Sequence, residues 1–463
     1  MVFSSLSFLV VFLPVLIILY FVRRQYVLLA FSLLFYGAGE PKYIFLIMAC
    51  VLITWFLSYF VERKEKLALI LAVLVNIIPL IVTKYSGFII RNTNRVINLL
   101  GLAGIPMPEI IMPIGISFYT FQVITYIVDL YRGEIKRQKN PLLFALYVMF
   151  FPQLIAGPIV KYSEVANELE NPDVSLENVK YGIGRLILGL GKKVLIANQV
   201  GFIANAIHLS DINSISPVMA WLCTLAFTIQ IYFDFSGYSD MAIGLGAIFG
   251  FHFPENFNDP YTSDSISEFW RRWHITLGRF FREYVYIPLG GNRVTKNRWI
   301  MNIAVVWTLT GLWHGASWNF VIWGAFHGVL IVIDRLTGLT KKLPKFLAYL
   351  LTIFMITVSW VFFMYDSISK KQMMIFIGKL FFISSEVIKP VSIGSLRLWS
   401  YIPFLIVGIF LSTPLWVKIR TKIAKFDTAT AKILFDIFLI VELLFSLMFL
   451  LGSTYNPFIY FRF

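Results

Sequence analysis

Long apolar runs separated by short polar stretches repeat along the whole sequence. Most runs come close to the ~20 apolar residues that a helix needs to cross the hydrocarbon core of a bilayer. The runs are continuous rather than alternating, which is typical of membrane helices and not of a membrane β-barrel. The pattern predicts an all-α polytopic membrane protein with roughly 11 transmembrane helices, expected at residues 6–21, 27–36, 44–61, 67–82, 111–130, 186–207, 218–251, 302–333, 347–364, 402–417 and 433–451.

Two apolar stretches differ from ordinary spans. Residues 111–130 include Ser117, Gln122 and Asp129, so this helix is expected to pack inside the bundle or line a cavity instead of facing lipid. Residues 142–160 contain FPQLIAGPIV, with two prolines and a glycine. A break of this kind at membrane depth is tolerated only where protein or water satisfies the freed backbone groups, so we expect a broken or re-entrant segment.

The charge of the chain indicates its orientation in the membrane. Of 463 residues, 58% are hydrophobic and 14% are charged, and the formal net charge is +15. We assign this excess to cytoplasmic loops and membrane lipids, and not to nucleic acid, because no basic region accompanies a nucleic-acid-binding fold. Arg23-Arg24 and the cluster ERKEK at residues 62–66 lie two spans apart, and a further basic loop lies at residues 418–425. If all are cytoplasmic, the N-terminus is extracytoplasmic.

The largest polar interruption, residues 252–298, contains a candidate amphipathic helix at residues 270–284. At 100° per residue, one face holds Trp270, Trp273, His274, Leu277, Phe280, Phe281 and Tyr284, and the other holds Arg271, Arg272, Thr276, Arg279, Arg282 and Glu283. Such a helix suits the membrane interface. The simpler interpretation is that most of the arginines anchor lipid headgroups and that His274 is structural. The functional alternative is that some arginines hold the phosphates of a nucleotide-type donor.

A second histidine, His314, lies in GLWHGASW, where Gly311 and Gly315 allow another helix or a substrate to approach closely. A buried histidine without a resident nucleophile suits a general base that takes a proton from an attacking substrate hydroxyl. The alternative is a histidine that is hydrogen-bonded within the bundle. The sequence contains no HExxH motif, no Cys/His cluster and no G-x-S-x-G elbow. We therefore expect neither a metal site nor a serine hydrolase.

A third histidine, His327, follows 13 residues after His314. If the helix continued, the two would lie roughly 20 Å apart along its axis and could not share a metal. We expect His327 to pack or to line a wall. Two carboxylates, Asp234 and Asp240, stand in the otherwise apolar stretch QIYFDFSGYSDMAIG, together with Tyr238. Intramembrane carboxylates are usually paired or functional. We favour a structural pairing with the arginines of residues 271–282.

Taken in order, these motifs resemble a known family. The stretches are YFDFSGYSDMAIG, NFNDPY, FWRRWHITLGRFFREYVYIPLGGNR and GLWHGASWNFVIWGAFHG, and the strong match covers residues 110–335. Together they look like the membrane-bound O-acyltransferase (MBOAT) family, and within it the bacterial branch of alginate and peptidoglycan O-acetylation proteins. The resemblance implies a helical bundle with a tunnel joining the two faces of the membrane. It also implies that His314 is the near-invariant histidine of the WHG motif and that His274 is the second histidine, in RWHI.

The resemblance further implies an activity. Acetyl would pass from cytoplasmic acetyl-CoA, with no tightly bound cofactor, to an extracytoplasmic polysaccharide, through a separate partner transferase with an SGNH-type fold. The chain would be a multi-pass protein of the bacterial cytoplasmic membrane. The expected residues are His314 and His274 for catalysis, Arg271, Arg272, Arg279, Arg282, Trp273, Trp313 and Asn319 for donor or substrate binding, and Asp234, Tyr238, Asp240 and His327 for the tunnel. We expect one membrane domain, residues 1–463, with N-terminal spans at 1–110, a catalytic core at 111–335 and C-terminal spans at 336–463.

Two other functions stay open at this point. D-alanyl transfer proteins of teichoic-acid assembly share the RWH and WHG elements, although the PLGGNR turn and the overall length favour the acetylation branch. A proton-coupled transporter could use the buried histidines and aspartates as a relay, but the sequence has no inverted repeat. Alginate, peptidoglycan, cellulose and other exopolysaccharides all remain possible acceptors.

Overall fold

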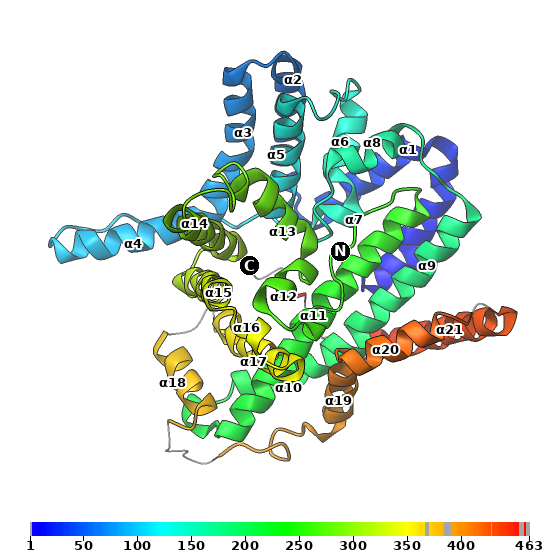
Figure 1. Ribbon diagram of the computed structural model, residues 1–463. Helices are drawn as coiled ribbons and strands as arrows, with labels where there is room; N and C mark the ends of the chain where they lie inside the picture. Colours follow the sequence, from blue (N-terminus) through cyan, green and yellow to red (C-terminus); the bar gives the residue numbers. More distant parts are fainter. Residues whose placement is uncertain (1, 366–369, 384–389, 427, 453–457, 460–463) are drawn as a thin grey trace. The chain divides into compact units, whose positions relative to one another are not determined.

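The computed structural model describes residues 2–365, 370–383, 390–426, 428–452 and 458–459 (Figure 1). In this part of the chain the regular structure is helical, apart from one isolated antiparallel bridge between Phe257 and Trp273. Eight of the described helices are long and apolar enough to cross a membrane, and a ninth span results if the bent pair Trp399–Leu411 and Pro414–Ile423 is counted as one. The all-helical multi-pass class is confirmed, whereas the expected number of 11 spans is not.

The chain folds as two compact units. Unit 1 comprises Met1–Leu186 and Met241–Glu255, and unit 2 comprises Ile187–Asp240 and Asn256–Phe463. Two helices, α9 (Leu176–Gly191) and α11 (Pro217–Ile248), run from one unit into the other. The single membrane domain in three segments stays a prediction.

Unit 1 begins with a helical run that folds back on itself. At Arg23 the backbone leaves the helical conformation (φ −148°, ψ 62°). Phe12 then packs on Phe31 and Phe35, with ring centroids 5.3 and 5.6 Å apart. These contacts make a hairpin of the two short apolar runs at the start of the sequence. The helices of unit 1 are η1 (Ser7–Phe12), α1 (Leu13–Gly39), α2 (Ile44–Glu62), α3 (Lys66–Leu80), η2 (Ile81–Tyr85), α4 (Ser86–Leu99), α5 (Ile116–Arg132), α6 (Pro141–Met149), α7 (Phe151–Leu154) and α8 (Tyr162–Glu170), followed by the first part of α9.

The break expected at FPQLIAGPIV is present between α6 and α7, where the backbone of Phe150 leaves the helical conformation (φ −57°, ψ 114°). Side chains satisfy backbone groups around it. Gln122 Nε2 donates to Tyr147 O at 2.7 Å, and Ser32 Oγ accepts the Phe151 N–H at 3.2 Å. Gln122 comes from α5, most of whose side chains are buried, as its polar residues predicted. The break is therefore tolerated for the reason the sequence suggested.

Unit 2 carries both histidine motifs. Its helices after α9 are η3 (Lys192–Ala197), α10 (Asn198–His208), η4 (Ile212–Ser214), α11, η5 (Pro260–Thr262), α12 (Ile266–Arg272), α13 (Ile275–Phe281), η6 (Arg282–Tyr286), α14 (Lys296–His314), α15 (Trp318–Thr337), α16 (Leu339–Lys342), α17 (Lys345–Met364), α18 (Lys370–Leu380), η7 (Trp399–Tyr401), α19 (Ile402–Leu411), α20 (Pro414–Ile423) and α21 (Ala429–Gly452).

The apolar run expected as one segment at residues 302–333 is a tight hairpin of α14 and α15. A Cβ at Gly311 would lie 2.3 Å from Phe320 O, and a Cβ at Gly324 would lie 2.2 Å from Trp307 O. The two antiparallel helices approach so closely because these positions lack a side chain. The continuous helix assumed between His314 and the third histidine is therefore wrong.

Candidate functional site

The amphipathic helix expected at residues 270–284 is interrupted at Trp273 and His274. Trp273 is extended and bridges Phe257, and His274 adopts a left-handed conformation with φ 48°. Few residues other than glycine adopt this conformation, so tertiary contacts hold it here. The prediction of one continuous helix is wrong because the break is made by pairing with residues upstream. One consequence is that Thr276, expected on the basic face, is buried.

This break holds His274 in the interior of unit 2. Its Nδ1 lies 3.1 Å from Asn256 Oδ1. Its ring packs against Phe235 of α11 and Trp313 of α14, with centroid distances of 4.8 and 5.6 Å. His274 lies between α12 and α13, outside the candidate spans. Burial lowers the pKa of its imidazole to about 3, so the ring is neutral at physiological pH and retains a lone pair that can accept a proton.

His314 is the last residue of α14 and is buried among aromatic rings. The centroid distances are 4.9 Å to Trp313, 5.0 Å to Trp323 and 5.1 Å to Phe363. Trp313 thus contacts both His314 and His274. The two histidines predicted to be catalytic, one at the end of α14 and one at the break between α12 and α13, lie around one indole ring.

His327 has both ring nitrogens engaged within the protein. Trp270 Nε1–H donates to His327 Nδ1 at 3.3 Å, and Nε2 lies 3.1 Å from Ser359 Oγ. Ser359 Oγ in turn donates to the Ile356 carbonyl at 2.7 Å. Since the indole N–H can only donate, His327 carries its proton on Nε2. These contacts favour the packing role, although the helical geometry first used to argue for it does not exist.

The intramembrane carboxylates pair with lysines rather than with the arginines that we expected. Lys193 Nζ lies 2.6 Å from Asp234 Oδ1, and Lys192 Nζ lies 2.6 Å from Asp240 Oδ2. Both lysines belong to η3, a π-helical turn packed on α11 within unit 2. Both carboxylates are thus paired, but the arginine partners that we expected are wrong, and the structural role of the pairs stays a prediction. The sequence signal was the adjacent pair of lysines inside the apolar run at residues 186–207.

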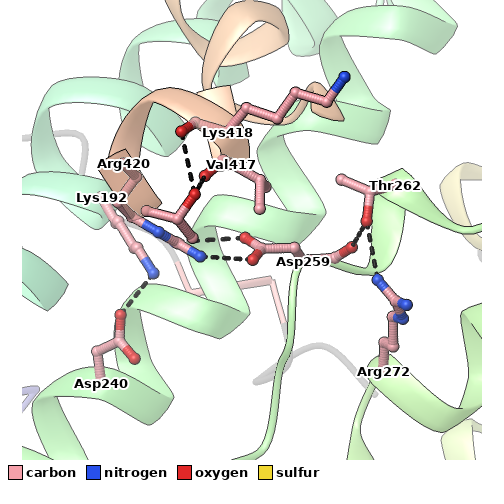
Figure 2. A network of polar contacts seen from close by, with 9 residues as sticks. Lys192, Asp240, Asp259, Thr262, Arg272, Val417, Lys418 and Arg420 are labelled. Carbon is pink, nitrogen blue, oxygen red and sulfur yellow. Dashed lines mark hydrogen bonds and ion pairs between the residues drawn. The ribbon is translucent and has the colours of Figure 1, made fainter. Parts of the chain in front are cut away.

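Arg271 and Arg272 were expected to bind the acyl donor. In the structure both form ion pairs within their own helix. Arg271 and Arg272 both contact Glu268, at 3.0 and 2.7 Å. Arg272 Nη1 also donates to Thr262 Oγ1 at 2.9 Å, which ties α12 to the preceding loop (Figure 2). Arg271 is still 75% exposed. Arg272 therefore serves the local structure, whereas Arg271 keeps a surface position where it can meet an anion.

A basic helix packs beside the same loop. Arg420 of α20 bonds to Asp259 at 2.6 Å, and Asp259 directly precedes η5 (Figure 2). The remaining expected arginines follow the break, with Arg279 partly exposed on α13 and Arg282 exposed on η6. The basic residues at 418–425, expected in a loop, instead lie mostly on α20, and this helix packs beside the loop before α12 within unit 2.

The other expected binding and tunnel residues pack within unit 2. Trp273 stacks on Phe269 with a centroid distance of 5.5 Å. Asn319 Nδ2 donates to Tyr365 O at 2.7 Å. Tyr238 stacks on Phe458, with centroids 4.5 Å apart. Each of these contacts is sufficient to explain the residue structurally.

One contributor to the site was not anticipated as such. Asn256 contacts His274 and lies in the quoted motif NFNDPY, but nothing in the spacing linked that motif to RWHI. The link is the backbone bridge between the two segments, which becomes visible only in three dimensions.

Comparison with known proteins identifies the family to which this site belongs. A model of the membrane-bound O-acyltransferase family matches residues 131–376, which is more than half of the chain. The chain belongs to the MBOAT family. It is 39% identical over 375 residues to the probable alginate O-acetylase of Pseudomonas aeruginosa, covering 78% of this chain and 72% of that protein. It is 37% identical over 409 residues to the peptidoglycan O-acetyltransferase of Helicobacter pylori, covering 78% and 77%.

A more distant relative is the teichoic acid D-alanyltransferase of Bacillus subtilis. It is 28% identical over 302 residues, covering 62% of this chain and 73% of that protein. The resemblance read from the motifs is thereby confirmed. This MBOAT chain is a multi-pass O-acyltransferase, and both RWHI and WHG fall inside the matched range.

Proposed function

We propose that this protein takes acetyl from cytoplasmic acetyl-CoA and supplies it for O-acetylation of an extracytoplasmic polysaccharide. The observation that carries the proposal is the pair His314 and His274 around Trp313 in a buried aromatic environment. Relatives named as alginate and peptidoglycan O-acetylating enzymes, at 39% and 37% identity, support acetyl as the group transferred. The 28% identity to a D-alanyltransferase makes D-alanine the second candidate.

In the proposed chemistry His314 acts as the general base. Its imidazole takes the proton of an acceptor hydroxyl while that oxygen attacks the carbonyl carbon of the thioester. The tetrahedral intermediate collapses, the C–S bond breaks, and the proton passes from the imidazolium to the CoA thiolate. The aromatic rings around His314 keep water away from the thioester, so hydrolysis does not compete with transfer.

The donor side of the site is proposed from the basic residues of unit 2. The Arg420–Asp259 ion pair brings the basic helix α20 to the loop before α12, the helix that ends in Arg271 and Arg272. The basic helices α20 and α12, joined through this loop, belong on one face of the membrane, and the positive-inside rule makes that face cytoplasmic. The exposed Arg271 and Arg282 are the side chains that we propose meet the phosphates of acetyl-CoA.

The acceptor side is proposed to be extracytoplasmic, since the polymers named for the relatives belong to the cell envelope. We place the protein in the bacterial cytoplasmic membrane with its N-terminus outside, because Arg23-Arg24 and residues 62–66 then face the cytoplasm. Delivery through an extracytoplasmic SGNH-type transferase fits a catalytic histidine that is buried and out of reach of a large polymer.

The proposal is tested by replacing His314 in the native bacterium. His314→Ala is expected to keep the wild-type amount of membrane protein and to lose alkali-labile acetate from envelope polysaccharide, since loss of a general base costs about 10²–10⁴-fold in rate. The matched control is His252→Ala. His252 pairs with Glu168 at 2.7 Å in unit 1, and its side chain is half exposed.

Wild-type acetate in the His314→Ala strain would contradict the catalytic assignment. Both acetate and D-alanine are measured in the same alkaline hydrolysate. Loss of D-alanine with unchanged acetate would identify the second candidate function.

A further inference from the structure

We infer that Asn256 is a positioning residue for acyl transfer: its side-chain oxygen holds the imidazole of His274 in the Nδ1–H tautomer and leaves Nε2 as the accepting atom. The role in transfer rests on the proposed function, whereas the tautomer does not. Asn256 and His274 both belong to unit 2, and both are buried.

The orientation of the Asn256 amide is fixed by groups whose hydrogen-bonding roles are certain. The backbone N–H of Thr276 lies 3.3 Å from Oδ1, and Thr276 Oγ1 lies 3.0 Å from the same atom. A backbone N–H can only donate, so the atom that it meets is the oxygen and not the amide nitrogen. On the other side, Asn256 Nδ2 donates to Ser239 Oγ at 3.2 Å. A flipped amide would place two donors against each other at Thr276.

The tautomer of His274 follows from this orientation. Its Nδ1 lies 3.1 Å from Asn256 Oδ1, which can only accept. Nδ1 therefore carries the hydrogen, and in the neutral ring Nε2 holds the lone pair. The rings of Phe235 and Trp313 pack against the imidazole, and Trp313 also contacts the ring of His314. Burial is the cause that lowers the pKa of His274, so the neutral ring persists at physiological pH.

The backbone of Asn256 is as firmly held as its side chain. Its carbonyl accepts the Ile275 N–H at 2.9 Å, and the next residue, Phe257, bridges Trp273. The same short pairing forces His274 into its left-handed conformation. One segment thus sets both the direction of the ring and its protonation pattern. His274 can then accept a hydrogen bond or a proton from a substrate hydroxyl at Nε2, but it cannot donate one from that atom.

The first test reads the tautomer directly. The full-length protein is labelled with ¹⁵N-histidine, reconstituted in lipid nanodiscs and examined by solid-state NMR. Only five histidines are present, and the His274 signals are assigned by their loss in His274→Gln. We expect a protonated Nδ1 in the wild type and a changed pattern in Asn256→Ala.

The matched control is Asn302→Ala, another buried asparagine of unit 2, whose Nδ2 holds the carbonyls of Leu289 and Gly291. It is expected to keep the wild-type signals of His274. A wild-type ring protonated on Nε2, or an unchanged pattern in Asn256→Ala, would overturn the inference. This readout does not depend on which acyl group is transferred.

The second test uses activity and guards against a variant that fails to fold. Asn256→Asp keeps an oxygen at the same position but places a carboxylate beside the imidazole, which favours the charged ring. The neutral ring then exists only at higher pH, so the acid limb of the pH–rate profile should move up by about one unit or more. A purely structural asparagine would change the amount of active protein and leave the profile in place.

If the acid limb of the pH–rate profile of Asn256→Asp lies at the same pH as that of the wild type, the inference is also overturned. If the wild-type protein itself transfers no acetyl from acetyl-CoA, the proposed function fails, and the NMR measurement still decides the tautomer.

Discussion

Two ion pairs between η3 and α11 have equal lengths but differ in burial, which gives a quantitative test of how this bundle tolerates charge. The Lys193–Asp234 and Lys192–Asp240 pairs both have N–O distances of 2.6 Å. The side chains of the first pair are 4% and 1% exposed, whereas those of the second are 33% and 9% exposed. Asp234 also accepts the Ile459 N–H at 2.7 Å.

Lys193→Met removes the ammonium group but keeps a side chain of similar length. Asp234 is then left charged and buried, which typically costs about 3–5 kcal/mol of stability. Lys192→Met breaks a pair that water reaches, so the expected loss is about 1 kcal/mol or less. The double variant Lys193→Met, Asp234→Asn leaves no buried charge and should recover most of the loss seen in the single variant.

The free energy of unfolding is measured for all variants in the same lipid and detergent mixture, by titration with a denaturing detergent and by thermal unfolding. When the single variant Asp234→Asn is measured as well, the double-mutant cycle isolates the interaction between the two side chains. Equal losses for Lys193→Met and Lys192→Met, or a double variant less stable than Lys193→Met, would refute the reasoning from burial.

Two further outcomes are expected. Gly324→Ala would place a Cβ 2.2 Å from Trp307 O, so the yield of folded protein should fall sharply. The control Gly452→Ala, with nothing within 4 Å of the added Cβ, should express normally. Equal yields of the two variants by size-exclusion chromatography would contradict the hairpin packing. Ser359→Ala removes the hydrogen-bond partner of His327 Nε2 and should cost about 1–3 kcal/mol of stability. The transfer rate per folded molecule should not change. A loss of rate with unchanged stability would argue for a catalytic His327.

The sequence was sufficient for those features that depend on local pattern. Continuous apolar runs identified the membrane class, and the Pro/Gly content of FPQLIAGPIV predicted the break between α6 and α7. The polar residues of α5 predicted its burial, because Gln122 and its neighbours are too costly to expose to lipid. The ordered motifs around His274 and His314 identified the family without any knowledge of how the two residues meet.

Features that depend on pairing between distant segments could not be read in the same way. The 100° periodicity put Thr276 on the basic face because it assumed an unbroken helix over residues 270–284. The helix is in fact broken by the bridge between Trp273 and Phe257. The separation of His314 and His327 was calculated along one continuous helix. It does not apply, because the chain turns back between α14 and α15. The partners of Asp234 and Asp240 were missed because Lys192 and Lys193 lie in a π-helical turn, where both contact α11. The pattern of side chains in the sequence does not predict such a turn.

The most direct test of the central claim follows labelled acetyl through the protein. Inside-out membrane vesicles, which expose the cytoplasmic face, are supplied with [¹⁴C]acetyl-CoA, and alkali-labile label in polysaccharide is counted. We predict transfer in vesicles with the wild-type protein and a loss of about 10²-fold or more with His314→Ala at equal protein amount. Transfer by His314→Ala at the wild-type rate would contradict the account.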